Sequence, residues 1–311
     1  MADNQNNAPT EIPESLARRI DAQYGSEAAV RIRAGFEAQR PTTLRANTLK
    51  ASHDDIASQL DEAGIAWEPA PAPALANAFV IRNAHEDAVR ELSAYDKGEV
   101  YLQSLSAMLP ALALDPRPNE NILDMAAAPG GKTCHMAALS GGGAFITACE
   151  KNHVRAERLR YNLAKQGAPR VNVMECDARK LDEFFRFDKI LLDAPCSGSG
   201  TVRIGPDARK CSFSDELLAR SVKTQQALLR RALDVLAPGG TLVYATCSIL
   251  AEENEGVLER VLAKSKADLV PLPERLLEGV PLLPCRLPEA AVVCPTDLFE
   301  GFFLALIEKK C

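Results

Sequence analysis

From residue 121 onward, short apolar runs alternate with longer amphipathic stretches, and this pattern constrains the fold more than any other feature of the chain. Each apolar run is bounded by turn-forming residues, as is typical of strands buried on both faces. The stretches between them space their apolar residues as helices do. The alternation therefore predicts an α/β fold with a doubly wound, mostly parallel sheet. The predicted strands are NILDM (121–125), AFITACE (144–150), VNVME (171–175), KILLD (189–193) and TLVYATC (241–247), and the predicted helices are 131–140, 152–166, 214–236 and 251–264.

Both ends of the chain depart from this pattern. AAVVCP (290–295) and GFFLALIEK (301–309) predict a terminal strand pair, added as an antiparallel edge to the parallel sheet. Upstream, residues 12–39 predict one or two helices, and residues 43–103 predict a small α+β unit of short strands and helices. We therefore expect two domains, residues 1–100 and residues 101–311.

Composition limits the classes of function. The 311 residues carry a net charge of −6, which argues against a protein that coats nucleic acid through bulk charge. The segment 151–210 is nevertheless basic on balance and leaves room for a local patch. The N-terminus lacks the features of a secretion signal, and no apolar run reaches the roughly 20 residues of a membrane span. We expect a cytoplasmic protein.

The nine cysteines show no CxxC pair and no zinc-ligand spacing, so we expect free thiols and no metal site. Unpaired cysteines are usually small core residues. Two of them stand apart, because Cys196 and Cys247 each follow a predicted strand, in 189-KILLDAPCSGSGTVR-203 and 243-VYATCSILAEENE-255. The remaining cysteines, such as Cys134 and Cys149, keep the core interpretation.

The stretch 121-NILDMAAAPGGKTCHMAAL-139 predicts a strand, a turn of small residues and the start of a helix. Bare backbone at a helix N-terminus lets a ligand approach the amide groups. Neither the GxxxxGK[ST] nor the GxGxxG spacing is present, so this is a nucleotide-type cradle without a diphosphate grip.

Three acids support the interpretation as a cofactor site. Glu150 and Asp193 end the second and fourth predicted strands, and Asp177 follows the third. The carboxyl ends of parallel strands converge on the ligand crevice. Carboxylates suit the ribose and adenine groups of an adenosine ligand but repel a diphosphate. The combination favours S-adenosylmethionine over NAD.

A thiol beside a methyl donor suggests covalent catalysis on a pyrimidine. Addition of a thiolate to carbon 6 makes carbon 5 nucleophilic enough to accept a methyl group. Carbon 5 must then lose its proton, and the thiol must leave. Spacing alone does not say which cysteine attacks.

The motifs that carry this chemistry resemble those of the Sun (NSUN) family of S-adenosylmethionine-dependent RNA cytosine-5 methyltransferases. The matching stretches are LDMAAAPGGKT, DAPCSGSGTVRIGPDARK, QQALLRRALDVLAPGGTLVYATCSILAEENE and EGFF, with weaker matches in PTTLRANTLK and YLQSLSAMLP. The resemblance covers most of the chain from about Arg40. It implies the Rossmann-like fold of class I methyltransferases and an RNA-recognition-like N-terminal domain.

The resemblance also implies roles for individual residues. Cys247 would be the nucleophile, Cys196 would assist release of the methylated product, and Lys132 and Asp193 would border the base. The implied cofactor-binding residues are Ala126, Ala127, Ala128, Pro129, Gly130, Gly131, Lys132, Glu150, Asp177 and Asp193.

A target cytosine must be single-stranded or flipped out of a helix to reach such a pocket. Arg203, Arg209 and Lys210 follow the Cys196 motif, and we expect them to contact RNA phosphates. Ribosomal RNA is the first expected substrate and transfer RNA the second. Two alternatives stay open: a catalytically idle RNA-binding ribosome-assembly factor, and a methyltransferase for protein or small molecules, which leaves both thiols unexplained.

Overall fold

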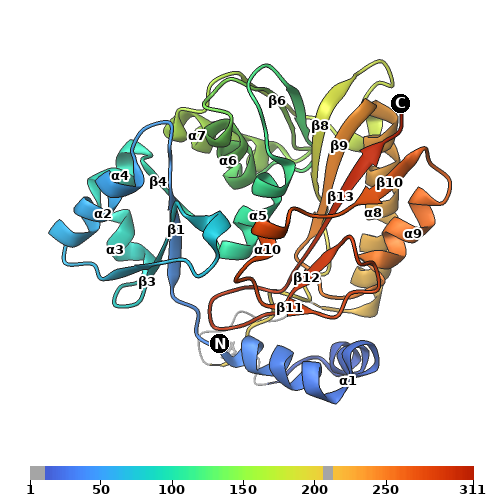
Figure 1. Ribbon diagram of the computed structural model, residues 1–311, viewed down its shortest axis with the longest axis horizontal. Coiled ribbons are helices and arrows are strands. Elements are labelled where there is room, and N and C mark those ends of the chain that lie inside the picture. The colour runs from blue at the N-terminus through green and yellow to red at the C-terminus, as the bar shows by residue number, and fades with distance from the viewer. Residues whose placement is uncertain (1–10, 206–212) are drawn as a thin grey trace, which may run out of the picture.

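The computed structural model describes residues 11–205 and 213–311, which form two sheets and a separate N-terminal helix. In Figure 1 the small sheet lies to the left and the large sheet to the right, and the N-terminal helix lies below. The large sheet carries the predicted α/β pattern.

The large sheet is doubly wound and mixed. Its order is β11-β12-β13-β9-β8-β5-β6-β7, and β10 pairs with β13. The run from β9 to β7 is parallel, whereas β13 pairs antiparallel with both β9 and β12. This confirms the predicted fold class and the C-terminal antiparallel strands. The bounds are β5 (Asn121–Asp124), β6 (Phe145–Cys149), β7 (Val171–Met174), β8 (Phe187–Asp193), β9 (Leu236–Thr246), β10 (Ala267–Val270), β11 (Leu282–Leu283), β12 (Ala291–Val293) and β13 (Phe302–Lys309).

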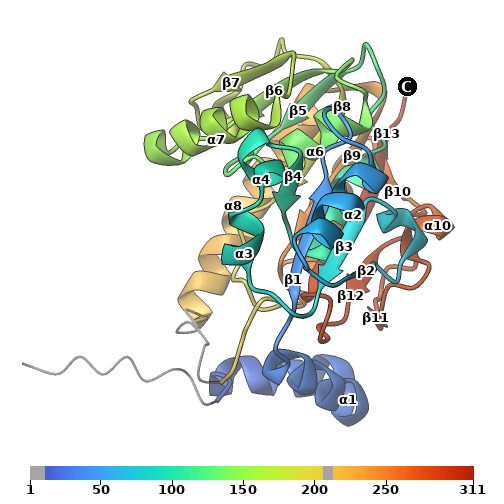
Figure 2. The same cartoon turned by 90° about the vertical axis from the view of Figure 1, so that its left-hand side faces the viewer.

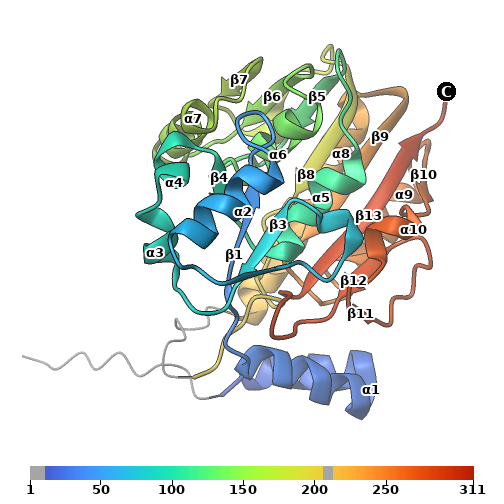
Figure 3. The same ribbon diagram turned by 60° about the vertical axis from the view of Figure 1, so that its left-hand side comes forward.

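Helices cover both faces of this sheet (Figure 3). One core contains α8 and α9 packed on Ile190 and Leu192, and the other contains α5 and α6 packed on Leu191. Consecutive residues of β8 face opposite sides of the sheet, because side chains alternate along a strand. The helices of this part are α5 (Leu105–Leu114), α6 (Gly131–Leu139), α7 (His153–Gln166), α8 (Asp215–Val235), α9 (Glu255–Leu262) and α10 (Glu274–Leu277), with a 3-10 turn η2 (Ala178–Lys180). None of the described helices has the length and apolarity that a membrane crossing requires.

Some elements differ from the sequence prediction. Helix α5 was not predicted, because LSAMLPALAL is apolar on all sides and shows no helical period. Helix α8 ends at Val235, one residue before the predicted end, but β9 begins at the next residue, so the Pro-Gly-Gly segment belongs to the strand and not to a loop. A register shift between Phe187 and Lys189 of β8 accommodates it.

The small unit is an antiparallel sheet of order β2-β3-β1-β4 with its own core. Its helix α2 begins with a capping box in which Ser52 and Asp55 exchange hydrogen bonds. The expected helix over 85–94 is two short helices, and the second ends at Gly98 with φ +70°. The elements are β1 (Thr42–Ala46), α2 (His53–Glu62), β2 (Trp67–Pro69), η1 (Pro73–Leu75), β3 (Ala78–Ile81), α3 (Glu86–Arg90), α4 (Ser93–Lys97) and β4 (Val100–Leu102).

Helix α1 (Glu14–Glu37) is kinked at Gly25 and lies apart from the small unit (Figure 2). Its buried residues Leu16, Ile20, Ile32 and Phe36 belong to the same core as α8 and α9. The helix therefore shares the core of the large unit, although the small unit separates the two in the sequence.

Candidate active site

The loop between β5 and α6, residues 125–130, is anchored by side chains from α7. Arg155 and Asn162 each donate a hydrogen bond to a carbonyl of this loop at 2.8 Å. Gly130 has φ +109°, a conformation that favours glycine. A Cβ added to Gly131 would lie 3.0 Å from the Tyr101 ring. The small residues predicted as a cofactor cradle therefore form a fixed and bare turn.

Two cavities flank this loop and bring the predicted residues together. Ala126 lines both of them. The first, of about 240 Å³, is lined by Asp124, Ala126–Pro129, Gly131, Lys132 and Asp193, with Tyr101, Leu102, Gln103 and Ala107. The second is lined by Glu150, Asp177, Ala126, Met125, Cys149, Lys151, Arg155, Cys176, Ala178, Arg179, Pro195, Thr224 and Leu228.

Glu150 and Asp177 lie at the carboxyl ends of β6 and β7 but in different environments. Glu150 is buried and accepts a hydrogen bond from the Asn152 amide at 2.8 Å. Asp177 caps the 3-10 turn η2, and hydrogen bonds from the Arg179 side chain lower the pKa of its carboxyl to about 2. Both acids are therefore placed as hydrogen-bond acceptors in the second cavity.

Lys132 and Asp193 form an ion pair in the first cavity, with Nζ and Oδ2 2.7 Å apart. Burial lowers the pKa of Lys132, but the charges of Asp193 and Asp124 outweigh this and raise it overall. Asp124 itself is fully buried and accepts a hydrogen bond from Thr133 at 2.7 Å. Burial raises the pKa of Asp124 to about 6, and the Thr133 hydrogen bond opposes that shift. The ammonium of Lys132 therefore stays charged beside the cavity.

Cys196 and Cys247 lie side by side, with their sulfur atoms 2.7 Å apart. Their loops follow β8 and β9, which pair in parallel with Asp193 opposite Ala245. We call residues 194–201 the PC loop and residues 247–254 the TC loop. Both thiols are free and half-buried. The sheet thus converts a separation of 51 positions in the sequence into direct contact.

The PC loop is held by a buried carboxylate from the TC loop. Glu253 accepts hydrogen bonds from the Ser197 amide at 2.8 Å, the Ser197 hydroxyl at 2.6 Å and Gln225 of α8 at 3.1 Å. Its backbone carbonyl accepts a hydrogen bond from Tyr244 at 2.7 Å. A buried carboxylate with this many donors is well compensated for the loss of water.

Close backbone contacts join the two loops to the segment before β13. The amide of Gly200 donates to the Cys247 carbonyl at 3.0 Å, and the amide of Gly301 donates to the Gly200 carbonyl at 2.8 Å. A Cβ on Gly200 would lie 2.2 Å from the Gly301 carbonyl oxygen, so any side chain there collides with backbone. The Ser199 and Ser248 hydroxyl oxygens lie 2.8 Å apart. The glycines of PCSGSG and EGFF are needed for this approach.

Helix α1 braces the TC loop from outside. Gln23 donates to the Ile249 carbonyl at 3.0 Å and accepts from the Ala251 amide at 2.9 Å. The hydroxyl of Tyr24 also donates to the Ile249 carbonyl. The sequence prediction assigned this helix to the N-terminal domain and gave it no part in the site.

The two thiols face opposite charges. The hydrogen bond with Cys247, burial and the charge of Glu253 all raise the pKa of Cys196 well above its ordinary value. Cys247 lies on the side of Lys132, and its charge contributes to the raised pKa of that lysine. The environment thus disfavours a thiolate at Cys196, whereas Cys247 lies on the side of the Lys132 cation.

Two family models match the chain. The one described as "16S rRNA methyltransferase RsmB/F" matches residues 111–308, and the one described as "Methyltr_RsmF/B-like, ferredoxin-like domain" matches residues 12–86. The chain belongs to the RsmB/F family. This confirms the resemblance inferred from the motifs around Lys132, Cys196 and Cys247.

Among similar proteins of this family is "Ribosomal RNA small subunit methyltransferase F" of Cronobacter sakazakii, which is 39% identical over 234 residues, 73% of this chain and 48% of that protein. "Probable ribosomal RNA small subunit methyltransferase B" of Bacillus subtilis is 33% identical over 316 residues, 97% of this chain and 67% of that protein. The chain spans about half the length of the F-type relatives it matches.

Solved structures agree with this assignment. A methyltransferase homolog from Pyrococcus horikoshii superposes with a TM-score of 0.81 at 31% identity, and the match covers 96% of each chain. NSun6 from the same organism, solved with SFG, has a TM-score of 0.83 at 24% identity over 96% of this chain and 98% of that chain. The second comparison supports the fold alone.

The predicted RNA-contact residues of this RsmB/F family member are only partly described. Arg203 is half-exposed and lies 3.8 Å from Glu300. Arg209 and Lys210 lie outside the described residues. An RNA contact by Arg203 therefore stays a prediction. In the structure its side chain lies near Glu300 of the EGFF segment.

Sequence reasoning missed Arg45 of β1, which joins the small unit to the cofactor loop. It is fully buried, donates to Gln103 at 2.9 Å and to the Gly131 carbonyl at 3.2 Å, and stacks 5.3 Å from the Tyr101 ring centroid. Burial lowers its pKa to about 10. The motif PTTLRANTLK contained it, but nothing in the sequence distinguishes a buried arginine from an exposed one on a short strand.

Glu253 was also missed, since the segment 251–264 was predicted only as a helix with an acidic start. The helix α9 begins at Glu255, and Glu253 and Asn254 are fully buried before it. The one feature of the sequence that could have indicated Glu253 is its position six residues after Cys247.

Of the cysteines expected in the core, Cys134, Cys149 and Cys294 are buried, and Cys176 and Cys285 are half-buried.

Proposed function

We propose that this protein transfers a methyl group from S-adenosylmethionine to carbon 5 of a cytosine in ribosomal RNA, through a covalent bond between Cys247 and carbon 6. The observation that carries the proposal is the 2.7 Å contact between Cys196 and Cys247, next to the Lys132–Asp193 ion pair. Membership of the RsmB/F family supports the same activity.

The residues around the loop fit the proposed cofactor. Bare backbone at residues 126–131 leaves room for the ligand, and Glu150 and Asp177 supply acceptors for the hydroxyl and amino groups of adenosine. The carboxylates would repel a diphosphate but not a sulfonium cation. When bound, S-adenosylmethionine supplies an electrophilic methyl group. Residues 126–132, Glu150, Asp177 and Asp193 would hold it.

Cys247 is our choice for the nucleophile. Its thiolate adds to carbon 6 of the cytosine, and carbon 5 then takes the methyl group. The neighbouring cation of Lys132 can donate a hydrogen bond to the base as negative charge accumulates during addition. Asp193 holds Lys132 in place and borders the same cavity.

Cys196 would act after methyl transfer. The proton on carbon 5 must leave before the bond between carbon 6 and Cys247 can break. Cys196 lies within hydrogen-bond distance of the Cys247 sulfur, and its raised pKa keeps it a thiol. It can pass its proton to the Cys247 sulfur as the bond to carbon 6 breaks and take the proton of carbon 5 in exchange. We therefore assign it to proton removal and release of the product.

We further infer that residues 101–311 form the methyltransferase domain and that the segment before residue 100 contributes to RNA contact. The separate core of residues 44–102 supports this division for the α+β unit. Helix α1 contributes structurally to the methyltransferase side, because its buried residues share one core with α8 and α9. Ribosomal RNA as substrate implies a cytoplasmic protein.

Bisulfite sequencing of total ribosomal and transfer RNA, from cells with and without the gene, tests the proposal. We expect one ribosomal cytosine to lose protection in the deletion strain and to regain it with the wild-type gene but not with Cys247→Ala. Loss of protection in transfer RNA would change the substrate and keep the chemistry. Unchanged protection in every RNA would support an idle assembly factor and contradict the proposed activity.

A further inference from the structure

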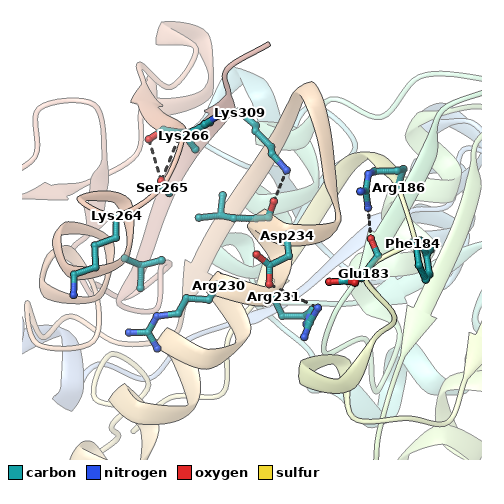
Figure 4. A pocket seen from close by; sticks show the side chains of 13 residues that line it. Glu183, Phe184, Arg186, Arg230, Arg231, Asp234, Lys264, Ser265, Lys266 and Lys309 are labelled. Atoms are coloured by element: carbon teal, nitrogen blue, oxygen red, sulfur yellow. Dashed lines mark hydrogen bonds and ion pairs between the residues drawn. The ribbon is translucent and has the colours of Figure 1, made fainter.

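A basic groove lies at the edge of the large sheet opposite the cysteines. It has a volume of about 770 Å³ and lies between the loop before β8, the end of α8, the end of α9 and the paired ends of β10 and β13. Its cations are Arg186, Arg230, Arg231, Lys264, Lys266 and Lys309, and its acids are Glu183 and Asp234 (Figure 4). Six cations in one groove are a marked local excess in a chain of net charge −6.

Some of these cations stabilise the fold. Lys309 donates to the carbonyls of Leu233 and Leu236 at 2.6 and 2.7 Å, where α8 ends and β9 begins. Arg231 lies 3.7 Å from Asp234. Lys309 caps the end of α8, and Asp234 neutralises Arg231. These roles explain both side chains without a ligand.

Three other cations have no such role. Within residues 11–205 and 213–311, Arg230, Lys264 and Lys266 make no ion pair, and all three are exposed. Arg230 has one long hydrogen bond, 3.4 Å, to Gln226 of its own helix. Arg230 comes from α8, and Lys264 and Lys266 come from the segment between α9 and β10, so the fold gathers all three around the groove. Uncompensated cations gathered from separate elements attract a polyanion.

An exposed aromatic side chain lies at the same groove. Phe184 is 84% exposed, whereas its neighbour Phe185 stacks on Phe187 with ring centroids 5.9 Å apart. Phe185 therefore fixes the loop to β8, and Phe184 projects from it into solvent. A positive groove with an exposed aromatic ring is the usual surface for a nucleic-acid strand, because phosphates pair with the cations and a base stacks on the ring.

The groove is too far from the cysteines to belong to their site. Strand β8 begins at Phe187, beside the groove, and ends at Asp193, in the cysteine site; seven residues of strand span about 20 Å. In Figure 1 the C-terminus, which follows Lys309 of the groove, lies at the top, and helix α1, which contacts the TC loop, lies at the bottom. An RNA held in the groove reaches the cysteines only if it extends around the domain.

We propose that this groove, built around Arg230, Lys264, Lys266 and Phe184, binds the phosphodiester backbone of the RNA substrate at a distance from the target cytosine. The inference rests on the proposed function, because it takes RNA as the substrate. It adds a second contact surface that selects for RNA long enough to cover both edges of the sheet.

The test compares two RNAs that share the target cytosine found by bisulfite sequencing. One is a short hairpin, and the other carries an added arm of about one helical turn with an unpaired tail. The groove variant is Arg230→Gln, Lys264→Gln, Lys266→Gln. Its control is Arg158→Gln, Lys223→Gln, Arg275→Gln, which removes the same charge from exposed positions outside the groove.

We expect the groove variant to raise KM for the extended RNA on the order of tenfold, with kcat unchanged, and to leave the short hairpin unaffected. When the logarithm of the affinity for the extended RNA is plotted against the logarithm of the salt concentration, the magnitude of the slope should fall by about three, one for each lost phosphate contact. The control variant should change neither. Phe184→Ala should weaken binding only when the unpaired tail is present.

Equal behaviour of the groove and control variants on the extended RNA would overturn the proposal. So would normal action on naked RNA combined with a loss of methylation on assembled small subunits, since that result assigns the groove to a ribosomal protein. If the wild-type protein methylates neither RNA, the proposed function fails. The salt dependence of wild-type and variant binding still decides the role of the groove in that case.

Discussion

The PC loop and the TC loop leave neighbouring parallel strands at the same edge of the sheet, yet they place their cysteines in opposite electrostatic surroundings. Cys196 shares its loop contacts with the buried carboxylate of Glu253, whereas Cys247 lies toward the ammonium of Lys132. In the sequence the two motifs look alike. The difference teaches that the roles of paired thiols depend on the charges packed around them and not on their spacing.

The largest effect should come from removing the thiol beside the cation. Cys247→Ala should lower turnover by at least about a thousandfold, because no nucleophile remains for carbon 6. Binding of S-adenosylmethionine, measured by calorimetry, should be unchanged. Alanine at the exposed Cys311 is the control and should keep full activity.

Removing the other thiol should separate the two roles. Cys196→Ala should lower turnover on the order of a hundredfold and accumulate a covalent RNA adduct, since the proton on carbon 5 loses its base. A denaturing gel with labelled RNA detects the adduct. An adduct formed by Cys247→Ala but not by Cys196→Ala would reverse the assignment of the two residues.

The asymmetry itself should respond to Glu253→Gln. Loss of the negative charge should lower the pKa of Cys196, so the pH profile of product release should shift to lower pH. In the wild type, Ser197 and Gln225 donate hydrogen bonds to the Glu253 carboxylate. The NH₂ group of the new glutamine would face one of these donors, and this should reduce the free energy of unfolding by about 2 kcal/mol.

Glu252→Gln is the matched control for this variant. Glu252 is partly exposed and pairs with the partly exposed Arg19 of α1, so its replacement should change stability by less than about 1 kcal/mol. Equal effects of the two substitutions on the pH profile would contradict the role given to Glu253.

The smallest effect should come from the external brace on the TC loop. Tyr24→Phe removes the hydrogen bond to the Ile249 carbonyl and should reduce the free energy of unfolding by about 1 kcal/mol, as measured by urea denaturation. Tyr161→Phe, on an exposed face of α7, should have no measurable effect. A Tyr24 variant as stable as the wild type would show that α1 holds the loop through packing alone.

Much of this architecture could be predicted because hydrophobic period is a local property. The strands of the parallel sheet and the acids at their carboxyl ends follow from runs of a few residues, and the family motifs identify the two cysteines. The position of α1 could not be predicted, since its partners Ile249 and Ala251 lie more than 200 positions away. Glu253 and Arg45 were missed for the same reason. Burial of a charged side chain depends on donors and rings supplied by distant elements, and no local pattern marks it.

The place of β13 in the sheet has a consequence for the order in which the active site forms during synthesis. Strand β9, which leads to Cys247, is paired on one side by β8 and on the other by β13. Until residues 302–309 have been translated, β9 is an open sheet edge, and the contact between Gly200 and Gly301 does not exist. The nascent chain therefore carries its nucleophile beside an unpaired strand until translation has passed Lys309. The contacts that join the PC loop, the TC loop and the segment before β13 are therefore complete only after β13 has paired with β9.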